Sequence, residues 1–184
     1  MKKYIAPIII LFIAFSSCKE DKIDLFAVSK HKVGMLNDST QVKEIKALFA
    51  NDSIVNFKED DSFVNGINTI DIYEKNGNQL LSITPNEALD STSTISSIQL
   101  IDPRYKTEKG ITSISTFKDV KDNYKISNIS NLINSVMITV NEIDATFTID
   151  KKELPTNMRF DMEMKIDPIQ IPDNAKVKFF IVYF

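Results

Sequence analysis

Two ten-residue segments, Thr40–Phe49 and Ser115–Tyr124, share one pattern of apolar and polar positions. Each has Ser or Thr, two residues, Lys, an acidic residue, an aliphatic residue, Lys, two residues and an aromatic. Apolar residues recur at spacings of three and four, which predicts one buried face of a short helix. The apolar positions are Val42, Ile45 and Phe49 in the first segment, and Phe117, Val120 and Tyr124 in the second.

Residues that cap helices precede both segments. Asp38, Ser39 and Thr40 stand before the first, and Thr116 stands three residues before Asp119 in the second, which is the spacing of a capping box. The sequence therefore predicts that the first helix begins at 38–40 and the second at 115–116.

Strand-like runs follow each helical segment. In the first half, Ile67–Tyr73 and Gln79–Thr84 flank an Asn76-Gly77 pair, which predicts a hairpin with φ > 0 at both positions. In the second half, 136–140 and 145–149 flank a turn at Asn141–Asp144. Further strands are predicted at 54–57, 93–101, 126–133 and 176–184. The last contains Phe179 to Tyr183 without a polar break, which predicts a central strand buried on both faces.

The pattern predicts an α+β fold made of two tandem repeats, 33–105 and 106–184. Each repeat is one short helix followed by an antiparallel meander of three or four strands. Since neither repeat buries enough apolar surface alone, we expect the two to share one sheet or core.

The first 17 residues have the pattern of an export signal. Lys2 and Lys3 precede the apolar run Ile5–Ala14, which is too short to span a bilayer as a stable helix. Small residues and the sole cysteine, Cys18, come next. This ending resembles the lipobox of bacterial lipoproteins, with Phe15 where Leu is usual. The resemblance implies that Cys18 is diacylated and that 18–32 form a tether, with an uncleaved signal-anchor helix as the alternative.

Two further resemblances concern location and architecture. Lys19-Glu20-Asp21 resembles the export signal of surface lipoproteins of Bacteroidota, although a plain solvated tether fits as well. The duplicated segments, each preceded by a glycine, Gly34 or Gly110, resemble the layout of secreted β-lactamase inhibitor proteins and of SmpA/OmlA-type outer-membrane lipoproteins. The segment Tyr105–Ile111 resembles that of Bacteroidota lipoproteins of uncharacterised role. The resemblance implies a lipid-anchored envelope protein, periplasmic or surface-exposed, and no functional residue.

Charge and composition exclude several classes of function. After removal of Lys2 and Lys3 the chain has 20 basic and 25 acidic residues, and only two of the basic residues are Arg. No nucleic-acid-binding surface is therefore predicted. The single His31, between two lysines, has no second His or Cys with which to bind zinc. We expect it to be solvated. No metal site and no cofactor are predicted.

Acidic and hydroxyl residues give the remaining candidates. Glu59-Asp60-Asp61 contains oxygen ligands for Ca²⁺ but not the spacing of a calcium loop, so a solvated loop is favoured. Three Asp-Ser pairs resemble the sequence on which Bacteroidota attach O-glycans. The candidate glycosylation sites are Ser91, which lies in a predicted exposed loop, and then Ser53 and Ser39.

Two classes of function remain. The favoured one is a non-catalytic, lipid-anchored envelope protein that presents a sheet face or loops to a protein or glycan. The alternative is an envelope hydrolase whose site leaves no sequence signature, since no Gly-x-Ser-x-Gly elbow is present. A broad sheet face with exposed aromatics would favour binding, and a closed pocket with perturbed carboxylates would favour catalysis.

Overall fold

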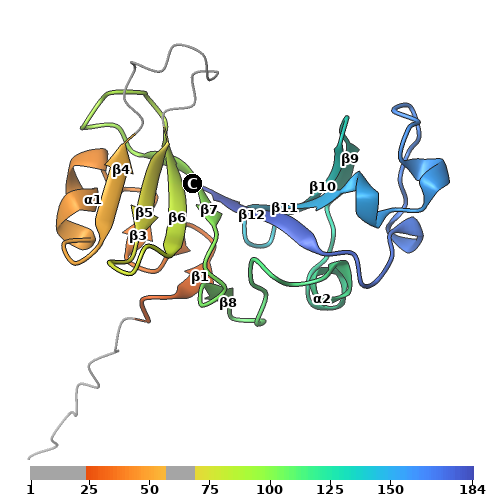
Figure 1. Cartoon of the computed structure of the whole chain (residues 1–184), viewed down its shortest axis with the longest axis horizontal. Coiled ribbons are helices and arrows are strands. Elements are labelled where there is room, and N and C mark those ends of the chain that lie inside the picture. The colour runs from red at the N-terminus through yellow and green to blue at the C-terminus, as the bar shows by residue number, and fades with distance from the viewer. Residues whose placement is uncertain (1–23, 57–68) are drawn as a thin grey trace, which may run out of the picture.

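The computed structural model describes residues 24–56 and 69–184, and shows an α+β fold with two sheets and two short helices. The main sheet has eight antiparallel strands in the order β4-β5-β6-β7-β12-β11-β10-β9 (Figure 1). Strands β7 and β12 therefore join the first half of the chain to the second. The strands are β4 (Ser53–Asn56), β5 (Ile70–Tyr73), β6 (Gln79–Pro85), β7 (Ile95–Leu100), β9 (Asn128–Asn131), β10 (Ser135–Val140), β11 (Ala145–Asp150) and β12 (Val177–Tyr183).

The two predicted helices are present as α1 (Val42–Leu48) and α2 (Phe117–Asn123). Ile45 and Val120, at their centres, are both buried, as the spacing of apolar residues predicts. The capping box of α2 is also confirmed: the Asp119 carboxylate accepts a hydrogen bond from the Thr116 N–H at 2.7 Å.

The predicted start of the first helix is wrong by one to three residues. Its N-cap is Gln41, whose N–H donates to the Glu44 carboxylate at 2.7 Å. Thr40 instead turns back, and its hydroxyl donates to the Asn37 side chain at 3.2 Å. Short polar side chains can bond to nearby groups in a turn instead of capping a helix, and Thr40 does so in the turn at 37–40.

One row of apolar residues crosses all eight strands on the helix side of the sheet. Each member pairs with the next through the strand register, and all are buried or packed against the core. This row runs Ile54, Ile72, Leu81, Leu100, Phe180, Phe147, Ile138, Ile129. Its centre is the pair of rings of Phe147 and Phe180, whose centroids lie 4.5 Å apart. The core is thus continuous from one end of the sheet to the other.

Both helices attach to the sheet through the same backbone contacts. In the first half Val42 N–H donates to Ser93 O at 3.0 Å, just before β7. In the second half Phe117 N–H donates to Ala175 O at 2.8 Å, just before β12. The next helical N–H in each case bonds a carbonyl two residues earlier, from Lys43 to Ser91 O and from Lys118 to Asp173 O.

A small second sheet packs beside the first half of the main sheet. Its order is β3-β2-β1-β8, and β1 and β8 are parallel (Figure 1). Its strands are β1 (Ala27–Ser29), β2 (Lys32–Val33), β3 (Leu36–Asn37) and β8 (Lys106–Thr107). The predicted tether, 18–32, therefore contains β1, where Val28 is buried against the folded part.

Both predicted hairpins are present, but the first turn differs from the prediction. In the turn between β5 and β6 only Gly77 has a positive φ, at 89°. Gly77 N–H donates to Glu74 O and Glu74 N–H donates to Asn78 O, both at 2.9 Å. This is a three-residue loop with a glycine bulge, and it places Asn76 in an ordinary conformation. The second turn is at 141–144, with Asp144 at φ 45°.

The connection from β11 to β12 is long and irregular. It contains three 3₁₀ turns, η1 (Lys151–Glu153), η2 (Thr156–Met158) and η3 (Pro168–Gln170). Buried Leu154, Met158 and Ile166 hold it against the core, and the Asn131 side chain donates to Met164 O at 2.9 Å. Within the described residues, no helix has the length and apolar character needed to cross a membrane.

Candidate functional site

The face of the main sheet opposite the helices is the candidate functional surface, and we call it the open face. The register places one row of side chains across it: Val55, Asp71, Ser82, Gln99, Ile181, Thr146, Thr139 and Asn128. Because strand side chains alternate between faces, this row lies beside the buried row and points the other way. Most of its members are small and polar, and all except Thr146 are at least partly exposed.

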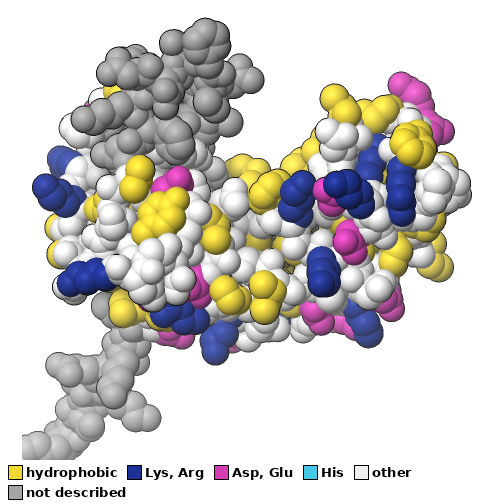
Figure 2. Space-filling model, in the orientation of Figure 1, with side chains coloured by type: hydrophobic (Ala, Val, Ile, Leu, Met, Phe, Trp, Pro, Cys, Tyr) yellow, Lys and Arg dark blue, Asp and Glu magenta, His cyan; other side chains and the backbone are white. Residues whose placement is uncertain are grey.

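Strand β12 departs from that polar pattern. Phe179, Ile181 and Tyr183 lie on its open-face side, and the residues Phe179 and Tyr183 are 38% and 41% exposed. The prediction that this strand is buried on both faces is therefore wrong. Its neighbours Phe180 and Val182 are buried on the helix side, so only half of the apolar run is used by the core. Figure 2 shows apolar side chains over the middle of the molecule, where the surface is hollowed toward the β9–β10 end.

The open face carries little net charge. Asp71, in β5, is the acidic member of the open-face row. Lys178, near the start of β12, pairs with Asp150 at 3.1 Å. The Lys152 backbone N–H and then the Lys178 ammonium lower the pKa of Asp150. Hydroxyl groups, an amide and aromatic rings surround these few charges. Such a surface suits an uncharged partner better than a phosphate backbone or an acidic peptide.

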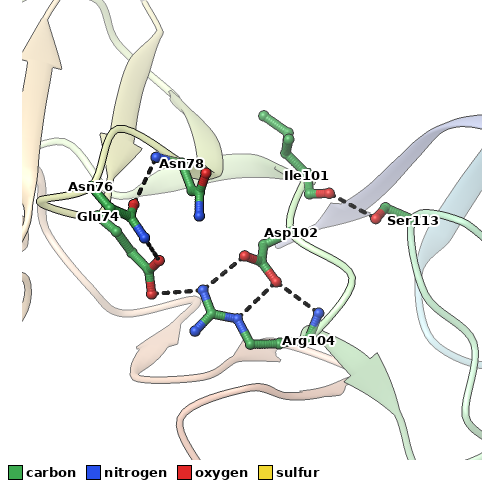
Figure 3. Close-up of polar contacts among 7 residues, drawn as sticks. All are labelled: Glu74, Asn76, Asn78, Ile101, Asp102, Arg104 and Ser113. Carbon is green, nitrogen blue, oxygen red and sulfur yellow. Dashed lines mark hydrogen bonds and ion pairs between the residues drawn. The ribbon is translucent and has the colours of Figure 1, made fainter.

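An arginine clamp holds the first half together away from the open face. Arg104 donates to Asp102 through Nε at 3.0 Å and to Glu74 through Nη2 at 2.7 Å (Figure 3). The hydrogen bonds from Arg104 lower the pKa of both carboxyl groups, and those carboxylates raise the pKa of Arg104. The clamp ties the β5–β6 turn to the segment after β7, so it is a structural contact.

The aromatic residues beneath this clamp are also structural. The guanidinium of Arg104 lies 4.6 Å from the centroid of the Phe26 ring, and that ring meets Tyr105 edge-on at 5.0 Å. Tyr105 is buried, and burial raises the pKa of its hydroxyl. These contacts fix the chain just before β1 against the segment that leads into β8.

The remaining perturbed carboxyl groups have local, structural causes. The Thr116 N–H lowers the pKa of Asp119 at the start of α2, and the Thr92 N–H lowers the pKa of Asp90 in a turn. Lys121 lowers the pKa of Asp173 by donating to it. Each is a helix cap, a turn or a surface ion pair, and none of these three lies on the open face.

The candidate glycosylation sites lie apart from one another. Ser91 is exposed in the turn before β7, although its carbonyl accepts a hydrogen bond from α1. Ser53 is exposed in β4, and Ser39 is exposed in the turn before α1, where its hydroxyl donates to Asn37 at 2.6 Å. Modification of all three stays a prediction. Cys18 lies outside the described residues, and its acylation stays a prediction too.

His31 occupies a place that its sequence context did not indicate. It is at the tip of the β1–β2 hairpin with a φ of 58°, and its Nε2 lies 3.5 Å from the Asp144 carboxylate. Lys30 meets the same carboxylate at 3.0 Å. The predicted acidic loop, Glu59–Asp61, lies outside the described residues. Among those described, no group of three His, Cys, Asp or Glu side chains is placed to hold a metal ion.

One signal for the open face was present in the sequence. The open-face positions of β7 are Ser97 and Gln99, whereas those of β12 are apolar, and the two strands share a sheet environment. The uninterrupted apolar run of β12 was interpreted as burial on both faces. An uninterrupted apolar run alone does not distinguish a covered sheet face from an exposed, partner-binding one.

Comparison with known proteins shows similarity at the level of the fold. No protein-family model matches the chain, and no curated protein matches it. A solved structure that does match is the crystal structure of the uncharacterized protein yfeY from Escherichia coli, with a TM-score of 0.56 and 19% sequence identity. The alignment covers 86% of this chain and 99% of that one. At this identity the chain is similar to yfeY in fold alone.

Proposed function

We propose that this protein is a non-catalytic, lipid-anchored envelope protein that binds a partner, protein or glycan, on the open face of its main sheet. The observation that carries the proposal is the exposure of Phe179 and Tyr183 on a central strand whose other face is fully packed. Apolar residues that the core does not use, set among small polar side chains, are the usual composition of a binding surface.

The comparison of β7 with β12 supports this proposal. Ile181 lies directly opposite Gln99, and Tyr183 lies directly opposite Ser97. A neighbouring strand at the centre of the sheet thus needs no apolar residue on this face. Apolar side chains on this face are therefore not a general feature of the central strands, which supports a role in recognition for those of β12.

We further propose that the fold is a tandem repeat of one helix and four strands. The support is the equivalent order α1, β4 to β7 and α2, β9 to β12, together with the equivalent helix attachments to Ser93 and Ala175. The strand order also runs outward from β7 and β12 in the same sequence. In this proposal the open face is built by both repeats, and the partner contacts both.

The anchor in this proposal is Cys18, in an outer-membrane protein of the Bacteroidota type. Two or three acyl chains give stable anchoring because each buried methylene contributes about 0.8 kcal/mol. Cys18→Ser should leave an uncleaved precursor that takes up no labelled fatty acid in the native host. A variant labelled as strongly as the wild type would contradict the lipoprotein assignment.

The binding role is tested by crosslinking the full-length lipoprotein in its own envelope and identifying the captured partner. The variants compared are Phe179→Ser, on the open face, and Ile114→Ser, an exposed apolar residue before α2. We expect Phe179→Ser to reduce capture at least tenfold and Ile114→Ser to leave it unchanged. Equal capture by Phe179→Ser and wild type would show that the open face is not the binding surface.

A further inference from the structure

A shallow pocket of about 330 Å³ lies at the end of the open face, where three segments far apart in the sequence meet. The β1–β2 turn, the β10–β11 turn and the end of β12 form its wall. Its lining includes His31, Thr139, Asn141, Asp144, Thr146 and Tyr183. Its volume is at the small end of the range of about 300–1,000 Å³ for sites that bind small molecules.

The ring of Tyr183 forms a platform in this pocket. Its hydroxyl lies 3.4 Å from the Thr146 hydroxyl on the neighbouring strand β11. Thr146 pairs across the strands with Ile181, two residues before Tyr183. To reach the Thr146 hydroxyl, the Tyr183 side chain must lie along the sheet instead of standing away from the sheet. The residue is 41% exposed, so part of it is accessible from solvent.

The polar wall of the pocket is held in place by contacts to several segments. The Tyr183 N–H donates to Asp144 O at 2.8 Å, which fixes the turn to the end of β12. The Asp144 carboxylate lies 3.0 Å from Lys30 Nζ and 3.5 Å from His31 Nε2. The Asn141 N–H donates to the Ser127 hydroxyl at 3.1 Å. The acceptors and donors around the ring are therefore positioned before any ligand arrives.

We propose that this pocket binds one neutral sugar ring of a glycan. The weakly positive C–H face of a pyranose is attracted to the negative face of the Tyr183 ring. Its hydroxyl groups can donate to the Asp144 carboxylate and exchange hydrogen bonds with Thr139. This inference rests on the proposed binding role of the open face, and it makes the glycan, not a protein, the ligand of this part of it.

The test is saturation-transfer NMR on the folded protein with four neutral probes. These are the methyl glycosides of glucose, galactose, mannose and N-acetylglucosamine. We expect at least one probe to receive saturation. Tyr183→Ala should weaken its binding at least tenfold, whereas Tyr183→Phe, which keeps the ring, should retain it. Phe160→Ala, which removes an exposed ring outside both the pocket and the open-face row, should bind as the wild type does.

A second variant keeps the test independent of folding. Asp144→Asn keeps a side chain that tolerates the positive φ of 45° and loses the charged acceptor, so it should bind the same probe at least fivefold more weakly. Failure of all four probes, or an equal loss in Phe160→Ala, would overturn the sugar site. Phe179-dependent capture of a protein from the envelope, with no sugar bound, would refute this inference while leaving the proposed function intact.

Discussion

The two halves of the main sheet agree on the helix side and differ on the open face. On the helix side Leu100 of β7 and Phe180 of β12 face each other in the same buried row. On the open face Gln99 of β7 lies opposite Ile181 of β12. The fold constrains the first pair because both side chains are removed from water. The fold does not constrain the second pair in this way, because neither side chain is fully buried. The difference between Gln99 and Ile181 therefore points to the open face as the place to look for function.

The connections between strands differ as well. The segment 86–94 joins β6 to β7, whereas 151–176 joins β11 to β12 and includes three 3₁₀ turns. The first hairpin turn is held by Arg104, and the second by Lys30 and His31 from the β1–β2 turn. The element order is thus shared, and the surface contacts are particular to each half.

The largest expected effect separates the two faces of β12. Phe180→Ala removes a fully buried ring that contacts Phe147, and should lower the free energy of unfolding by about 3–5 kcal/mol. Phe179→Ala, one residue away on the open face and 38% exposed, should lower it by about 1–2 kcal/mol, because part of its surface is already in water. Urea denaturation measures both. Similar losses in the two variants would mean that the open face is covered in solution.

The next effect compares the centres of the two helices. Ile45→Ala and Val120→Ala should each cost about 2–4 kcal/mol, by lost transfer free energy and the cavity left behind. Ile45→Ala should cost about 0.8 kcal/mol more than Val120→Ala, because it removes one more methylene. Chemical denaturation at 25 °C gives the values. A helix whose central residue can be truncated without loss would not be equivalent to the other.

Two glycines, one in each half, should differ in the stability that they lose on substitution by alanine. Gly34 and Gly110 both have positive φ, at 57° and 80°, so alanine at either should cost about 1–2 kcal/mol. A Cβ at Gly34 would lie 2.4 Å from Leu25 O, whereas Gly110 has open space around it. Gly34→Ala should therefore cost at least ~1 kcal/mol more, since backbone must move. Equal melting temperatures for the two variants would contradict this close approach.

The smallest effect concerns the helix caps and depends on pH. The pKa of Asp119 is below its ordinary value because the carboxylate accepts the Thr116 N–H. Its contribution is therefore complete above about pH 4 and is lost as the pH falls through its folded-state pKa. Asp119→Asn should cost about 0.5–1 kcal/mol at pH 7 and progressively less as the pH falls through the folded-state pKa of Asp119. Denaturation at several pH values measures this, and a difference between wild type and variant that does not shrink as the pH falls would exclude the charge as its cause.

The sequence predicts the helix side of this molecule better than its surface. The spacing of Ile45 and of Val120 predicts both helices because core burial repeats with the helical period. The Asn76-Gly77 pair predicts a hairpin but not its loop length, since glycine alone satisfies the bulge. The small sheet was missed because its strands have two or three residues, too few to show alternation.

The candidate site was predicted only in outline. The sequence indicated a sheet face that binds a partner, but Phe179 and Tyr183 were assigned to the core because an apolar run fits a covered strand equally well. The pocket at Tyr183 could not be predicted. It depends on His31, Asp144 and Tyr183 meeting across the fold, and their separation in sequence leaves no local pattern.

The central claim is that the open face, not the helix side, meets the partner. The most direct measurement places a photo-crosslinking residue at position 179 or, as the control, at the exposed helical position of Lys43, in the full-length protein produced in its native host. The open-face position should give one discrete adduct and the helical position none. Adducts from position 43 alone, or from neither position, would contradict the account.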